Sequence, residues 1–285
     1  MKVTKLLLLI AFLTPIMGGV VLGQSTTEVK LKDYKRIDKP ARDEVSGIVK
    51  DKRFKDVIWV HGDSGTKNRV YPINEKGELL PNKDSKGLEI KEVENKDWED
   101  IAIDENGNLY IADIGNNCSC RKDQSIIVLN NPKIENEESK DFEVYKISYE
   151  KPGGFLYKFL NYSMDVEALF IKNEKLFVLT KRYRGKDTKL FVLDTLVKDK
   201  VNEFKLVQAT DFDDEVTGAD YAFGKLAVLT YRSIWIFEDD ETEDFFDGEV
   251  SRYAFDGKQI ESVTFLDPET ILIAEEEGEM YKIKL

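Results

Sequence analysis

Carboxylates at a recurring spacing are the residues of this sequence whose chemistry stands out. Five short segments share one pattern: an acidic or amide residue, an apolar residue, an acidic or hydroxyl residue, a small residue (once Asp) and a second apolar residue. Carboxylate oxygens bind hard cations such as Ca²⁺, and carboxylates held close together shift one another's pKa values. The five segments are residues 44–48, 97–101, 165–169, 215–219 and 259–263.

The residues that follow each segment indicate the fold that would position these carboxylates. The clearest copy has an apolar run at 101–103, the turn Glu105-Asn106-Gly107-Asn108 and a second apolar run at 109–112. Asn-Gly between apolar runs is a strong hairpin signal. A third apolar strand and a more polar outer strand follow, and units of roughly 40 to 50 residues with this content are typical of propeller blades. The sequence predicts an all-β chain that forms a single β-propeller of five four-stranded blades.

Two features bear on blade number and ring closure. The interval of 68 residues between Glu99 and Glu167 leaves room for a sixth blade, although residues 135–141 are typical of a polar loop. The last blade lacks a fourth strand, because Leu285 directly follows its third strand. We expect residues 28–34 to supply that strand, since closing the ring removes an exposed sheet edge. No segment has the periodicity of a helix of several turns.

The first 23 residues differ from the rest of the chain. Lys2 and Lys5 precede an apolar run, and Gly18, Gly19 and Gly23 follow it. This order is typical of a secretory signal peptide, with cleavage expected between residues 23 and 24 and a propeller domain over 24–285. The alternative is an uncleaved N-terminal anchor. Either way the protein is expected to be secreted or extracytoplasmic, with contact to a membrane only through such an anchor.

The net charge of the chain limits the classes of molecule that it is expected to bind. The formal net charge is −13, and removal of Lys2 and Lys5 with the signal would leave −15. Nucleic-acid binding requires a basic face, so DNA and RNA are not expected partners. A small molecule, a glycan or another envelope protein is expected instead, with Ca²⁺ as the candidate cofactor and otherwise none.

Propeller geometry predicts where the acidic segments meet. The innermost strand lines the channel and the second strand runs antiparallel beside it, so the start of the first and the end of the second share one face. We therefore expect the acidic segments and the residues that end the second strands to meet at one mouth of the channel. The expected metal ligands are Asp97, Glu99, Asp165, Glu167 and Glu261. The expected ligand-binding residues are His61, Asp63, Asp113, Asn116, Lys181, Arg182 and Arg232.

Like charges crowded at such a mouth are unfavourable unless something compensates them. Three explanations remain open: a bound hard cation, ion pairs with Lys181, Arg182 and Arg232, or carboxylates with raised pKa values. A fourth interpretation gives the segments no site at all. Polar residues that start each blade then hydrogen-bond strand to strand and simply hold the ring together.

Cys118 and Cys120 lie in the loop after Asp113, and an exported chain favours a disulfide between them. A bridge between residues two apart closes a very small ring and would stabilise the fold little. The alternative is a metal site in which His61, Cys118 and Cys120 join Asp63 or Asp113 around Zn²⁺ or copper. The sequence contains no phosphate-binding glycine loop, nucleophile elbow or metalloprotease motif.

Residues 97–102 followed by 110–117 resemble the signature of a family of secreted prokaryotic β-propeller proteins that has no assigned reaction. Residues 59–65, 165–169, 180–182 and 216–220 fit the same pattern, whereas the insertion of residues 118–120 departs from it. The resemblance implies a propeller and export. More distantly, the architecture is similar to propeller phytases and calcium-dependent lactonases, which hold Ca²⁺ with carboxylates at the channel mouth; their ligand sets do not match here residue by residue.

Two functions follow from these patterns, and the sequence leaves open whether the protein is an enzyme. The first is an exported binding module with an acidic, cation-binding mouth. The second is a Ca²⁺-dependent hydrolase of a phosphate ester or lactone, in which Asp97, Glu99, Glu167 and Glu261 hold the metal. Lys181, Arg182 and Arg232 would then bind the substrate anion, and a carboxylate of raised pKa would transfer protons.

Overall fold

A computed structural model describes residues 25–285, except 33, 119, 151–163, 183–186 and 240. The predicted signal segment 1–23 therefore lies outside the described residues. Within the described part of the chain, no helix combines the length and the apolar character that crossing a membrane requires. The one helical element described is a single 3₁₀ turn, Phe245–Asp247.

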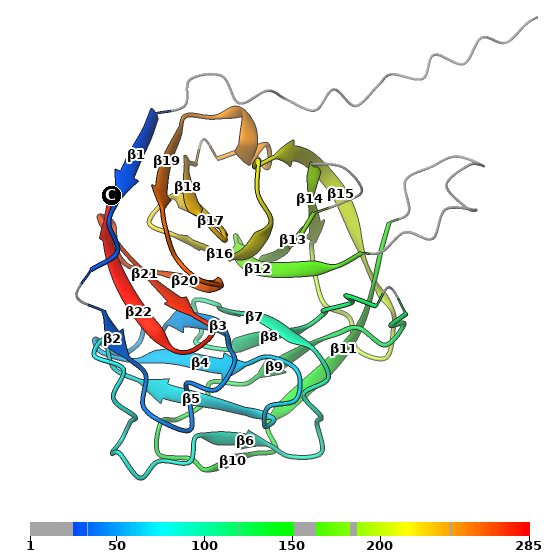
Figure 1. Cartoon of the computed structure of the whole chain (residues 1–285). Coiled ribbons are helices and arrows are strands. Elements are labelled where there is room, and N and C mark those ends of the chain that lie inside the picture. Colours follow the sequence, from blue (N-terminus) through cyan, green and yellow to red (C-terminus); the bar gives the residue numbers. More distant parts are fainter. Residues whose placement is uncertain (1–24, 33, 119, 151–163, 183–186, 240) are drawn as a thin grey trace, which may run out of the picture.

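The fold is a β-propeller, as predicted, with its sheets arranged around a common centre (Figure 1). Each acidic segment leads directly into an innermost strand, and each such strand pairs antiparallel with the next strand along the chain. The innermost strands are β3 (Val45–Lys50), β7 (Trp98–Ile103), β12 (Val166–Lys172), β16 (Val216–Ala222) and β20 (Ile260–Asp267). Their partners are β4 (Ile58–Gly62), β8 (Leu109–Asp113), β13 (Lys175–Thr180), β17 (Lys225–Thr230) and β21 (Thr270–Glu275).

Third and outer strands complete these units. The third strands are β5 (Arg69–Ile73), β9 (Ser125–Leu129), β14 (Asp187–Leu193), β18 (Ser233–Glu238) and β22 (Glu279–Lys284). The outer strands that follow them are β6 (Leu88–Ile90), β11 (Phe142–Tyr149), β15 (Asn202–Asp211) and β19 (Val250–Phe255). We number the units one to five by their innermost strands; the blade count of the complete chain stays a prediction, because residues 151–163 are outside the described part.

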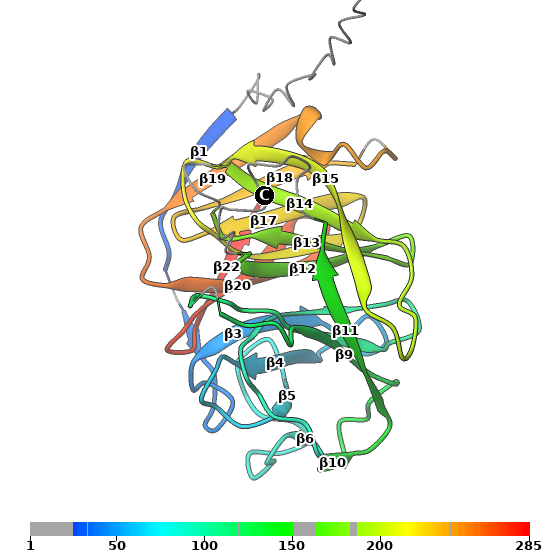
Figure 2. The same cartoon turned by 90° about the vertical axis from the view of Figure 1, so that its right-hand side faces the viewer.

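Two outer strands make pairings that the sequence did not indicate. β11 and β15 run parallel at residues 147–149 and 202–204, which joins the second and third units into one eight-stranded sheet. Residues 135–141, expected to form a polar loop, contain a short strand, β10 (Glu138–Ser139), that lies parallel to β6. Figure 2 shows the long strands β11 and β15 crossing the outer side of the molecule.

The ring is closed by an N-terminal strand, but not by the segment that we expected. The strand paired with β22 is β2 (Lys35–Arg36), not residues 28–34. Upstream of it, β1 (Ser25–Val29) lies parallel to β19 on the fourth unit. Val29 and Leu31 pack there against an apolar cluster that includes Phe255 and Ile260. The segment that includes Val29 and Leu31 therefore lies on the fourth unit, with these two side chains partly buried.

Hydrogen bonds between units surround the axis of the ring. The fully buried Asp100 on β7 accepts the backbone N–H of Leu169 on β12 at 2.8 Å and that of Ala219 on β16 at 3.2 Å. Asp220 on β16 accepts the N–H of Phe265 at 2.8 Å and the hydroxyl of Thr264 at 2.9 Å. Because β7 and β16 belong to units that are not neighbours, Asp100 spans the middle of the ring.

Two further bonds continue this circle. The Thr264 hydroxyl oxygen accepts the N–H of Lys50 on β3 at 2.9 Å. The Ser46 hydroxyl donates to the carbonyl of Glu99 at 2.6 Å. All the innermost strands are therefore connected through polar side chains near the axis, in addition to the apolar clusters that pack between neighbouring sheets.

We expect Asp100→Ala to lower the free energy of unfolding by about 3 kcal/mol, because two buried N–H groups from other units would lose their acceptor, at roughly 1–3 kcal/mol each. Urea unfolding measures this effect. Asp256→Ala, at an exposed position, is the matched control and should cost less than about 0.5 kcal/mol. Equal urea midpoints for the two variants would show that Asp100 does not hold the ring.

Candidate functional site

A β-bulge lies at the third position of every acidic segment. The pairing of each innermost strand with its partner skips one residue there, and the skipped residues are Ser46, Glu99, Glu167, Thr217 and Glu261. A bulge redirects the side chain it carries. The two hydroxyls bond to a neighbouring strand: Ser46 donates to the Glu99 carbonyl and Thr217 to the Ile260 carbonyl at 2.9 Å. The three glutamates belong instead to the acidic mouth, the end of the central channel at which the innermost strands begin.

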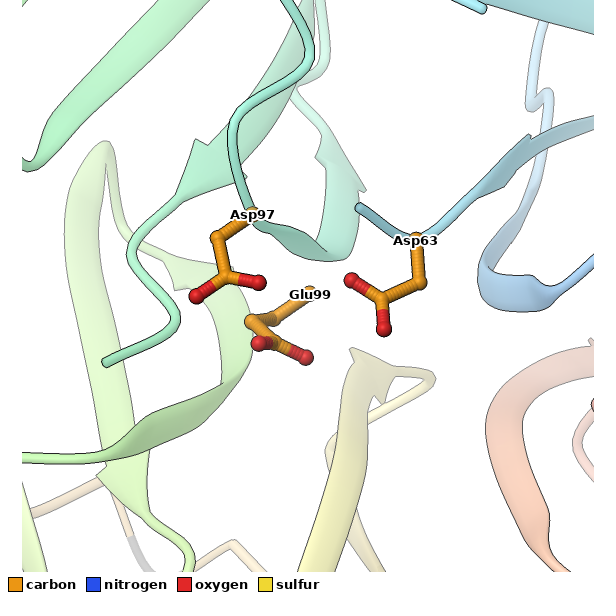
Figure 3. A group of neighbouring side chains, drawn as sticks. All are labelled: Asp63, Asp97 and Glu99. Carbon is orange, nitrogen blue, oxygen red and sulfur yellow. The ribbon is translucent and has the colours of Figure 1, made fainter. Parts of the chain in front are cut away.

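Three carboxylates converge at this mouth. One oxygen from each of Asp63, Asp97 and Glu99 lies within 4.8 Å of the other two. Figure 3 shows their carboxylate groups pointing toward a shared space. Asp63 follows the end of β4, Asp97 precedes β7, and Glu99 sits on the β7 bulge. The site therefore combines the start of one innermost strand with the end of the second strand of the preceding unit, as propeller geometry predicts.

Gly115 makes room for this triad. A Cβ atom at Gly115 would lie 1.9 Å from Oε1 of Glu99 and 2.5 Å from Cγ of Asp97. No side chain fits at such distances, so the loop after β8 approaches the two carboxylates through bare backbone. The requirement for glycine here comes from close approach and not from backbone conformation.

The pKa values of the triad are displaced upward. Burial is the largest cause for Asp63, Asp97 and Glu99, and it raises the pKa of Glu99 well above its usual range. Repulsion from neighbouring carboxylates adds to burial, with Glu167 and Asp63 the main contributors at Glu99. The cluster is thus unfavourable in its fully charged form unless a proton or a cation accompanies it.

Glu167 and Lys181 form a second part of the mouth. The Lys181 ammonium nitrogen lies 3.4 Å from Oε1 of Glu167 and 5.7 Å from the centre of the Tyr231 ring. Burial raises the pKa of Glu167 to about 8 despite this cation. Burial also raises the pKa of Glu261 to about 7, with Lys181 opposing the shift. The carboxyl groups of Glu167 and Glu261 therefore change protonation state near neutral pH.

Two acidic residues extend the mouth on the side of the fifth unit. The Glu276 carboxyl interacts with that of Glu44, and burial together with this contact raises the pKa of Glu276 to about 7. Glu276 follows β21, and its N–H donates to the carbonyl of Gln259 at 3.1 Å. Residue 276 was assigned no role from the sequence.

Arg121 is a cation of the mouth that sequence reasoning missed. Its Nη2 lies 2.9 Å from Oδ1 of Asp113, and its Nη1 lies 3.8 Å from Oδ2 of Asp97. Its own N–H donates to the Asn116 side-chain oxygen at 2.9 Å. Its place in an irregular loop beside the cysteines gives no periodic signal, so only the folded loop brings Arg121 to Asp97.

Four of the predicted ligand-binding residues either make structural contacts within the fold or lie away from the triad of Asp63, Asp97 and Glu99. His61 is fully buried edge-on against Trp98 at 5.6 Å between ring centres, and burial lowers its pKa to about 4. Asn116 donates its N–H to the Asp165 carboxylate at 2.9 Å. Arg232 is 73% exposed and faces Asp214 at 3.7 Å. Arg182 is half-buried next to Lys181 and directly precedes residues 183–186, which lie outside the described part.

The two cysteines form a disulfide, with their sulfur atoms 2.09 Å apart and their Cα atoms 5.2 Å apart. Neither sulfur is then available as a thiolate to the alternative zinc or copper site. The buried His61 hydrogen-bonds through Nδ1 to the Gly62 carbonyl at 3.1 Å, and Gly47 packs against the rest of its ring. His61, Cys118 and Cys120 therefore make other contacts in the structure and do not form a shared metal site.

No family model matches the chain, and no curated protein matches it in sequence. Solved structures with similar folds include the glutaminyl cyclase of Myxococcus xanthus, at 10% identity over 91% of this chain and 98% of that one, with a TM-score of 0.49. A gluconolactonase of Xanthomonas campestris has 10% identity over 89% and 96%, with a TM-score of 0.48. The PQQ-bound aldose sugar dehydrogenase of Streptomyces coelicolor has 13% identity over 88% and 81%, with a TM-score of 0.46. These sequence identities and TM-scores do not support matching any site residue of this chain to a residue of those proteins.

In a chelating buffer we expect the free energy of unfolding to fall as the pH rises from 5.5 to 8.5. The folded pKa of Glu167 is about 8, above its usual 4.5, so over this range the folded chain holds a proton that the unfolded chain has lost. A tenfold difference in proton affinity between the folded and unfolded chain corresponds to about 1.4 kcal/mol. Urea midpoints across this range measure the fall.

Glu167→Gln should make this dependence shallower, chiefly above pH 7, because an amide does not titrate whereas Glu261 and Glu276 still contribute below about pH 7. Glu137→Gln, at an exposed glutamate, should leave it unchanged. A parent protein whose stability is constant over this range would contradict the raised pKa.

Proposed function

We propose that the protein is an exported binding module whose acidic mouth binds a divalent cation, with Ca²⁺ the first candidate. The observation that carries this proposal is the convergence of Asp63, Asp97 and Glu99 within 4.8 Å. Oxygens that each lie about 2.3–2.6 Å from one Ca²⁺ ion are separated by at most roughly 5 Å. The three carboxylates therefore fit one ion, with further coordination positions left for water or for an oxygen of the bound partner.

Electrostatics favours a cation at this place over a purely structural cluster. Lys181 and Arg121 supply positive charge, but Lys181 faces Glu167 and Arg121 mainly faces Asp113. None of the hydrogen bonds described for the chain reaches the buried Glu99 carboxylate. A divalent cation would offset the repulsion that raises the pKa of Glu99, whereas the hydroxyls of Ser46 and Thr217 already serve the strand-to-strand role.

The partner of such a module is a molecule with its own oxygen ligands. A small molecule, a glycan or an envelope protein with acidic or hydroxyl groups would complete the coordination of the ion. Export through residues 1–23, by a cleaved signal or by a retained anchor, would expose the mouth to the millimolar Ca²⁺ at which extracellular calcium modules work.

We expect millimolar Ca²⁺ to raise the unfolding temperature of the chelator-treated protein by several degrees, since an ion that binds only the folded state stabilises it. The double variant Asp97→Asn/Glu99→Gln should lose this response. In chelator the same variant should unfold at or above the parent's temperature, because two repelling charges are gone, which separates loss of binding from loss of folding. Differential scanning calorimetry measures both effects.

Glu137→Gln/Asp256→Asn removes the same two charges from exposed positions and is the control. It should respond to Ca²⁺ as the parent does. An equal response in all three proteins, or in none, would sink the cation site.

A second candidate function is Ca²⁺-dependent hydrolysis of a phosphate ester or lactone. The observation that favours it is a pair of carboxyls, Glu167 and Glu261, with pKa values of about 8 and about 7 beside the triad. Groups that titrate near the working pH are suited to general acid–base catalysis. Lys181 would attract the substrate anion.

If this function holds, aryl phosphate or lactone turnover will require Ca²⁺ and will follow an ionisation near pH 7–8. Glu167→Gln should reduce kcat by about 100-fold or more, as for other general acid–base groups, while Glu137→Gln should not. Ca²⁺ binding without turnover of either substrate class leaves the binding module as the function.

A further inference from the structure

A cleft of about 800 Å³ lies where the fifth unit, the first unit and the N-terminal segment meet. Its walls come from the segment between β1 and β2, from the turn after β5 and from β22; Figure 1 shows this N-terminal segment passing along β22. None of its lining residues belongs to the acidic mouth, so the cleft is a separate feature of the molecule.

The cleft is basic on a strongly acidic chain. Two acids, Asp56 and Glu75, share its lining with five lysines, although the chain as a whole carries −13. Lys282 lies 2.6 Å from Glu75. The other four make no ion pair with a described residue, and their side chains belong to exposed residues. The five lysines are Lys30, Lys32, Lys35, Lys76 and Lys282.

Three of these lysines are close together in the sequence, and the fold adds Lys76 and Lys282 from two other segments. Lys30, Lys32 and Lys35 precede or belong to the closing strand β2, Lys76 follows β5, and Lys282 lies on β22. Five lysines face only two carboxylates around this cavity, so the lining carries an excess of positive charge whose members repel one another. Folding brings them together nonetheless, and a multiply charged anion would relieve that repulsion.

The residue types indicate which anion. Lysine is a compact point charge with three donors, whereas arginine binds planar carboxylates in a fixed two-point geometry. Arg36, the nearest arginine in sequence, is occupied with Glu279 at 3.4 Å. A cluster of lysines without arginine therefore favours a ligand by its number of negative charges and not by a planar shape, and phosphate groups are ligands of this kind. Leu80, Leu272 and Met280 form an apolar part of the lining, on which a ligand body can rest.

We propose that this cleft binds a phosphate-bearing anion with several charges, and that the anion holds the closing strand against its neighbours. The ligand would contact Lys30 and Lys32 on the N-terminal segment, Lys76 on the first unit and Lys282 on the fifth. The link between β2 and β22 has only two residue pairs, so an anion that spans the cleft adds contacts where the pairing is short. This proposal is independent of the cation site.

Inorganic tripolyphosphate is the soluble probe, and vesicles with phosphatidylglycerol test a lipid phosphate, with phosphatidylcholine vesicles as their blank. The binding variant is Lys30→Gln/Lys32→Gln/Lys76→Gln, which leaves β2 intact. The control is Lys122→Gln/Lys140→Gln/Lys200→Gln, which removes the same charge from exposed positions elsewhere. Titration calorimetry gives Kd, and chymotrypsin cleavage after the 53% exposed Tyr34 reports on the N-terminal segment.

We expect the binding variant to raise the Kd about tenfold, since three exposed charge pairs with the anion are lost, and the control to change it less than about twofold. Bound anion should slow cleavage after Tyr34 in the parent and the control only. Binding of either phosphate source with this pattern supports the proposal, and the source that binds identifies the ligand's origin. Failure of both probes, equal weakening in the two triple variants, or binding that leaves cleavage unchanged overturns it.

Discussion

The structure depends on a carboxylate buried in the middle of the ring. A charge without water is costly, and Asp100 is tolerated there because backbone N–H groups from two other units donate to it. Burial raises its pKa, and these N–H donors oppose the shift. Asp100 directly follows Glu99, yet one side chain ties strands together near the axis and the other belongs to the mouth. The bulge at Glu99 separates these two roles within two consecutive residues.

The two ends of the central channel differ in chemistry. The mouth described above is acidic. The opposite end surrounds a cavity of about 40 Å³, where Val49, Ile103, Ile171, Phe223 and Phe265 lie beside Lys50, Lys52 and Asp220. Phe223 and Phe265 meet edge-to-face there, with 6.3 Å between ring centres.

The sequence was a good guide wherever a local pattern repeats. Asn106-Gly107 marks a hairpin, and the apolar runs place the innermost and third strands correctly. It was a poor guide where partners are chosen by contacts far apart in sequence. Arg121 reaches Asp97 through a loop without periodicity, and β1 pairs with β19, which leaves the two residues of β2 to close the ring. His61 ends a strand next to Asp63, but the bulge and Gly47 turn its ring into the core.

The N-terminal pairings also determine how the domain would carry a mechanical load. If the chain were pulled from its N-terminal side, tension would reach β1 before β2, because β1 comes first along the chain. The five residue pairs of β1 with β19 would have to separate before the two pairs of β2 with β22 carried the load. The strand that closes the ring would therefore be the second to bear such a force, not the first.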